Sequence, residues 1–110
     1  MARRQVPGMG GMGNMNMVKQ AQKLQQDMMK AQEELMAREY SASSGGGAVT
    51  VVALGSRELV SVTIKPEAVD PEDVEMLQDM VLTAANEALR KAEDDMQKEM
   101  SRYTGGLGLF

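Results

Sequence analysis

The stretch that decides the fold lies in the middle of the chain, at residues 38–66: REYSASSGGGAVTVVALGSRELVSVTIKP. Val, Thr, Ile and Tyr recur in it at every second position, and this alternation is typical of strands, whose successive side chains point to opposite faces of a sheet. The triple glycine at 45–47 and the Gly55-Ser56 pair predict tight turns, and Pro66 predicts the end of the last strand. The stretch therefore predicts a three-stranded antiparallel meander.

Each predicted strand has one apolar face. The residues that share it are Tyr40 and Ala42, then Val49, Val51 and Ala53, and then Val60, Val62 and Ile64. The opposite face carries Val52, Leu54 and Leu59 among threonines and serines, so it is not fully polar. We therefore expect the second face to be a candidate for burial as well.

A helix is predicted before the meander, from an N-cap at Asn14 or Asn16 to about Ala37. Its apolar residues follow a heptad pattern, with Ala21, Met28 and Leu35 at a and Met17, Leu24 and Ala31 at d. Such a seam packs against another helix, and methionine serves there as an adaptable filler. Residues 1–13 are rich in Gly and Met without periodicity, and we expect them to be a flexible tail.

A second long helix is predicted after the meander. Asp70 is placed at the N-cap and Pro71 at the first helical position, and the acidic residues that follow complement the positive end of the helix dipole. An apolar face continues to about Tyr103, and the glycines that follow predict the end of the helix. We expect residues 104–110 to form a second flexible tail.

The predicted architecture is one α-β-β-β-α domain of the α+β class, covering residues 14–103. Strands of this length span about 20 Å, whereas a helix of about 22 residues is about 33 Å long. Both helices therefore extend beyond the sheet. Because their apolar seams need partners, we expect the helices to cover each other and a second copy to complete a homodimer with projecting helices.

Composition excludes several classes of function. The chain has 110 residues with no histidine and no cysteine, so disulfides, thiolate chemistry, the commonest general base and the commonest metal ligand are all missing. The glycines after Ser43 lack the Gly-Lys-Ser/Thr ending of a phosphate-binding loop, and the acids at 70–75 are explained by helix capping. No apolar run approaches the roughly 20 residues that span a bilayer. We therefore expect no enzyme, no metal or other cofactor, no small-molecule substrate and no membrane partner.

Charge is distributed unevenly along the chain. The net charge is −4, but residues 1–40 hold six basic and four acidic side chains, whereas residues 65–110 hold five and eleven. The basic side chains of the leading end and of the last helix form a candidate phosphate-contacting surface, although the acidic net charge weighs against it: Arg3, Arg4, Lys19, Lys23, Lys30, Lys98 and Arg102. The alternative is that these side chains are only solvated, and that the protein is a homodimeric coiled-coil-like scaffold or adaptor for other proteins.

Four segments resemble the YbaB/EbfC family of bacterial nucleoid-associated proteins. They are GGMGNMNMVKQAQKLQQDM, SGGGAVTVVALGSRELVSVTI, DPEDVEMLQDMVLTAANEALRKAEDDMQKEM and TGGLGL, and together they cover nearly the whole chain. Lys65 stands where the family typically has an aspartate. The resemblance implies a tweezer-like dimer that binds DNA without catalysis, in the cytoplasm and at the nucleoid, with a role in nucleoid organisation, recombination or repair. The best match among the basic residues is the pair Lys19 and Lys23.

Overall fold

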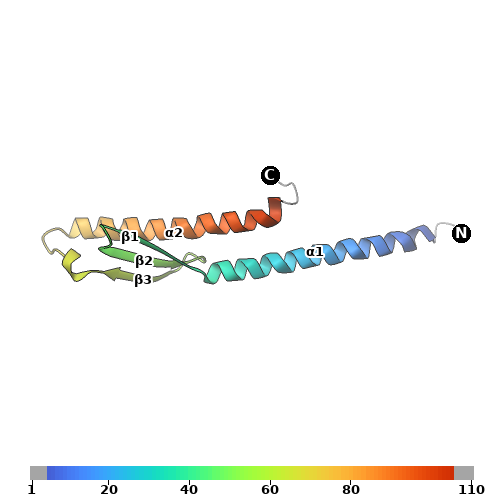
Figure 1. Ribbon diagram of the computed structural model, residues 1–110, viewed down its shortest axis with the longest axis horizontal. Helices are drawn as coiled ribbons and strands as arrows, with labels where there is room; N and C mark the ends of the chain where they lie inside the picture. Colours follow the sequence, from blue (N-terminus) through green and yellow to red (C-terminus); the bar gives the residue numbers. More distant parts are fainter. Residues whose placement is uncertain (1–4, 106–110) are drawn as a thin grey trace.

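The computed structural model describes the backbone of residues 5–105 and the side chains of residues 15–103. The elements in chain order are α1 (Gln5–Ala37), β1 (Glu39–Ser44), β2 (Val49–Leu54), β3 (Leu59–Ile64), the short 3-10 helix η2 (Pro66–Ala68) and α2 (Val74–Gly105). Figure 1 shows α2 lying along one face of the sheet, while α1 continues past the end of the sheet as a projecting arm. The α+β class and the α-β-β-β-α order are confirmed.

The sheet is the predicted antiparallel meander with strand order β1-β2-β3. Ala42 pairs with Val51 and Val51 with Val62, so the apolar residues of one face align across the strands. The β1–β2 turn holds Gly45, Gly46 and Gly47 at φ of 61°, 66° and 93°, values that side chains disfavour. The glycine run is thus explained as turn chemistry.

The core between α2 and the sheet is built from small side chains. Eight described hydrophobic residues are buried, and five of them are alanines, including Ala84, Ala88 and Ala92 of α2 at 0% exposure. Alanines at this spacing let α2 approach Val49 and Val51 closely, but they bury little apolar area each. The second face of the sheet is half-buried at Val52 and Leu54.

The third strand is covered least. Leu59, Val60 and Val62 are 45%, 53% and 46% exposed, because α2 packs on β1 and β2. The structure contains one chain, so the homodimer that would cover this strand stays a prediction.

The start of α1 differs from the prediction. α1 begins at Gln5, whereas the sequence placed the N-cap at Asn14 or Asn16, which lie inside the helix. Pro7 falls in the first turn, where its missing N–H has no helical acceptor in any case, and each glycine costs a helix only about 1 kcal/mol. The flexibility predicted for residues 1–13 and 104–110 stays a prediction, and residues 1–4 and 106–110 lie outside the described part.

The N-cap of α2 was predicted three residues too early. α2 begins at Val74, and Asp73 Oδ1 accepts the N–H of Met76 at 3.2 Å, which is the N-cap interaction. Asp70 instead closes a turn before the helix, where its Oδ1 accepts the N–H of Glu72 at 2.9 Å. Both aspartates have the chemistry of a cap, and the sequence could not distinguish them.

The heptad seam of α1 is covered over only part of its length. Leu35 is 2% exposed and Leu24, Met28 and Ala31 are half-buried, whereas Met17 is 68% exposed. The helix of 33 residues is about 50 Å long. The molecule accordingly measures 90 × 23 × 16 Å, and its radius of gyration is 23.8 Å, against about 13 Å expected for a compact chain of this length. The described side chains from Met15 to Ala21 are all exposed, and this part of α1 projects away from the sheet (Figure 1).

Candidate nucleic-acid interface

A row of lysines follows the projecting half of α1. Lys19, Lys23 and Lys30 are spaced by four and seven residues, which places them on one face of the helix. All three are exposed, and none forms an ion pair or hydrogen bond within the described residues. We call Lys19, Lys23 and Lys30 the lysine row.

The row is most basic toward its outer end. Residues 15–26 contain Lys19 and Lys23 and no acid, whereas Lys30 lines a shallow hollow together with Asp27, Glu34 and Tyr103. Because the acids lower the potential around Lys30, the two outer lysines offer the stronger attraction for an anion. Because Tyr103 lines this hollow, the end of α2 lies beside residues 27–34 of α1, and Lys19 and Lys23 lie further out along the helix.

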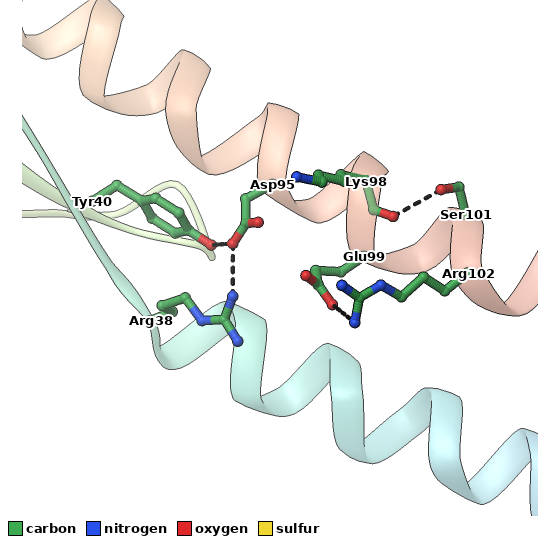
Figure 2. A network of polar contacts seen from close by, with 7 residues as sticks. All are labelled: Arg38, Tyr40, Asp95, Lys98, Glu99, Ser101 and Arg102. Carbon is green, nitrogen blue, oxygen red and sulfur yellow. Dashed lines mark hydrogen bonds and ion pairs between the residues drawn. The ribbon is translucent and has the colours of Figure 1, made fainter.

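The remaining predicted residues have different surroundings. Arg3 and Arg4 lie outside the described residues. Lys98 is exposed and forms no ion pair in the described part of the chain, and its positive charge helps to lower the pKa of Asp95. Arg102 forms an ion pair with Glu99 at 3.2 Å, drawn in Figure 2, so its charge is partly neutralised within its own helix. The contacts of these side chains with DNA stay a prediction.

The sequence did not predict the polar network at the base of the arm (Figure 2). Arg38, directly after α1, forms an ion pair through Nη1 with Asp95 Oδ2 of α2 at 2.8 Å, and the Tyr40 hydroxyl of β1 donates a hydrogen bond to the same oxygen. We call Arg38, Tyr40 and Asp95 the base network. Arg38 and Asp95 are 57 residues apart in the sequence, and a pair so distant cannot be predicted from a local pattern.

Each residue of the base network has its pKa shifted in the direction that favours the charge state in which it makes its contacts. The hydrogen bond from Tyr40 and then the Arg38 charge lower the pKa of Asp95, although its partial burial opposes them. Burial and then the bond to Asp95 raise the pKa of Tyr40, and the bond to Asp95 raises the pKa of Arg38. All three therefore keep the charge states that hold them together across the ordinary pH range.

Among the described residues, the acidic side chains near the start of α2 do not form a metal site. Asp73, Glu75 and Asp79 line a hollow of about 440 Å³ beside the β1–β2 turn. Within the part of the chain that the structure describes, no three acidic side chains come together in a way that could hold a metal ion. No helix among the described residues is long and apolar enough to cross a bilayer.

A small sheet covered by one helix, with a second helix projecting as a lysine-bearing arm, defines an α+β protein built to present a basic helical surface. A model of the YbaB/EbfC DNA-binding family matches residues 9–107. This chain belongs to that family.

Relatives support this assignment over the full length. A nucleoid-associated protein of Acetivibrio thermocellus is 59% identical over 98% of this chain and 95% of its own length. One from Alkaliphilus metalliredigens is 56% identical over 100% of both chains, and one from Pelotomaculum thermopropionicum is 62% identical over 89% of this chain and 97% of its own.

A solved structure supports the fold. The crystal structure of the uncharacterized protein HP0035 from Helicobacter pylori matches with a TM-score of 0.58 and 24% identity, covering 71% of this chain and 90% of that chain. At this identity the likeness concerns the fold alone.

Proposed function

We propose that the protein binds duplex DNA as a homodimer, through phosphate contacts made by the α1 arms and without catalysis. The observation that carries the proposal is the lysine row, which is exposed, unpaired within the described residues and placed on a helix that projects from the rest of the chain. Cations of this kind bind DNA by releasing the counterions condensed on its phosphates. Binding of this type positions a protein on the duplex but does not read the base sequence.

The composition of the arm supports duplex rather than single-stranded DNA. Residues 15–37 of α1 contain no aromatic side chain. Proteins that bind single-stranded nucleic acid commonly stack its bases on aromatic side chains. Without such side chains, the charged backbone of a duplex is the better ligand for the lysine row.

The bare third strand supports the homodimer. Leu59, Val60 and Val62 are about half exposed on the edge strand β3, next to a core of small residues. A second copy placed on this surface would bury it and would enlarge a core that one chain supplies poorly. Two copies would also provide two arms, and two linked sites bind much more tightly than one when both can engage the same duplex.

The proposed setting is the nucleoid in the bacterial cytoplasm. The relatives described above carry the name nucleoid-associated protein. A dimer that coats or bridges DNA without reading its sequence suits nucleoid organisation, and through it recombination or repair.

The experiment is to reverse the lysine row to glutamate (Lys19→Glu, Lys23→Glu and Lys30→Glu together) and to titrate duplex DNA at several salt concentrations. A dimer would lose six phosphate contacts, so the slope of log affinity against log salt should fall by about 5. Lys65→Glu carries a charge reversal at the other end of the molecule and should leave the slope nearly unchanged. Binding by the triple variant with the parent's affinity and slope would show that the row is not the DNA site.

A scaffold for proteins is the second candidate, and one observation favours it. The arm carries an apolar groove of about 460 Å³ that includes Met17, Ala21, Leu24 and Met28. Such a stripe on a helix suits a partner helix. If the parent protein does not bind duplex DNA even at low salt, this function replaces the first.

A further inference from the structure

The base of the α1 arm is joined to the β2–β3 turn by backbone hydrogen bonds. The N–H of Gly55 donates to the carbonyl of Arg38 at 2.9 Å, and the N–H of Ser56 donates to the carbonyl of Met36 at 3.2 Å. Carbonyls in the last turn of a helix have no helical donor and must find partners elsewhere. The β2–β3 turn thus caps α1, and the direction in which the arm leaves the sheet depends on that turn.

Position 55 must be glycine because the contact leaves no space for a side chain. Its backbone conformation does not require glycine. A Cβ atom at this position would lie 1.8 Å from the carbonyl oxygen of Leu35 and 2.7 Å from its carbonyl carbon. Backbone atoms in a helix cannot move aside as a flexible side chain can. The backbone of the turn therefore packs directly against the backbone at the end of α1, with no space for a side chain between them.

Side chains tie the same junction to α2. The base network joins Arg38 and Tyr40 to Asp95, whose side chain is 25% exposed (Figure 2). In the β2–β3 turn itself, Arg57 Nη2 lies 3.1 Å from Glu93 Oε1, and Arg57 has a φ of 70°, which is uncommon for a residue with a side chain. The end of α1, the β2–β3 turn and α2 are thus joined to one another by these contacts.

We propose that Arg38, Tyr40 and Asp95 are positioning residues that, together with Gly55, set the direction of the α1 arm and thereby place the lysine row on DNA. The inference rests on the proposed function and adds to it the residues that aim the arm. A projecting helix acts as a lever, so a small rotation at its base moves its outer lysines by many ångströms. Two arms engage one duplex together only when their spacing matches it, so the base network acts on affinity without touching DNA.

The sharpest test is a pair of charge-matched variants on α2. Asp95→Asn and Asp94→Asn each remove one negative charge at adjacent positions, but Asp94 is exposed and has no partner among the described residues. If charge alone mattered, both variants would bind the DNA polyanion more tightly. If Asp95 aims the arm, Asp95→Asn weakens binding about fivefold or more, while Asp94→Asn binds as well as the parent or better.

A second readout measures the arm directly and needs no DNA. The chain has no cysteine, so nitroxide labels can be placed cleanly at Gln22 on α1 and Gln78 on α2, with excess unlabelled protein added to isolate distances within one chain. The distance distribution should broaden in Asp95→Asn and stay narrow in Asp94→Asn. Tyr40→Phe removes one hydrogen bond without changing charge, and it should broaden the distribution in the same sense should Asp95→Asn fail to fold.

The outcomes separate this inference from the proposed function. Unchanged distances in Asp95→Asn and Tyr40→Phe, or tighter DNA binding by Asp95→Asn, would overturn the positioning role. Failure of the parent to bind duplex DNA would instead refute the proposed function, and the label distances would still decide whether the base network aims the arm.

Discussion

Gly55→Ala should redirect the arm without changing the identity of any charged residue. The added Cβ would lie 1.8 Å from the carbonyl oxygen of Leu35, and ordinary contact begins near 3.4 Å, so the end of α1 must move by the difference, 1.6 Å. Spread over one helical turn of 5.4 Å, that displacement tilts the helix by about 16°. Lys19 lies 16 residues, or about 24 Å, from Leu35 along the axis, so its position should shift by about 7 Å.

The same substitution has a cost in stability. Displacing α1 weakens the two backbone hydrogen bonds between the β2–β3 turn and the end of the helix. Net losses of about 1 kcal/mol for each bond, together with about 1 to 3 kcal/mol of strain from an overpacked contact, give a destabilisation of about 3 to 5 kcal/mol. Urea unfolding followed by circular dichroism measures this change, and spin labels at Gln22 and Gln78 measure the tilt.

Gly46→Ala is the matched control. It makes the same chemical change in the other turn, where a Cβ would meet nothing within 4 Å but the φ of 66° is unfavourable for alanine. It should cost about 1 kcal/mol and leave the label distances unchanged. A narrow, parent-like distance distribution in folded Gly55→Ala would refute the argument that close contact at Gly55 directs the arm.

Two further predictions concern the dimer and pH. Val62→Asp should convert the dimer to monomer in sedimentation experiments, because a carboxylate would lose its hydration in the interface, whereas Val69→Asp, at a valine equally exposed outside the sheet, should not; a parent that sediments as a monomer contradicts the homodimer. Because the pKa of Asp95 is lowered in the folded protein, its stabilising contribution is present above its unfolded pKa of about 4 and is lost as the pH falls through its folded value. The difference in unfolding midpoint between the parent and Asp95→Asn should therefore be present at pH 7 and shrink toward pH 3, and a difference that does not depend on pH would count against the network.

The strands were predictable because their signals are local. The alternation through Val49, Val51 and Ala53 has the period of a strand, and the glycines at 45–47 supply turn conformations that other residues avoid. Helix ends were harder. Asp70 and Asp73 can both cap a helix, and the choice between them depends on how η2 leads the chain into α2.

The candidate site also has one part that the sequence could predict and one part that it could not. The lysine row was predictable because it depends on helical spacing and, for Lys19 and Lys23, on the absence of acids among residues 1–26. The base network was not, because Arg38 and Asp95 meet only after the meander has brought the end of α1 beside the middle of α2. Gly55 was correctly predicted to lie in a turn, but what requires glycine there is the lack of space beside Leu35, not a left-handed φ.

An acidic chain can still bind DNA, because charge acts locally. The net charge of −4 includes a group of acids at residues 67–79, at the end of a molecule 90 Å long from which the arm points away. The screening length at physiological salt is about 8 Å, so phosphates in contact with Lys19 and Lys23 experience those lysines and very little of the distant acids. The acids instead repel DNA from the sheet end. Under the proposed function, a duplex is therefore favoured along the arms and disfavoured at the sheet end, and the direction of the arms, with the residues that hold it, decides how tightly the protein binds.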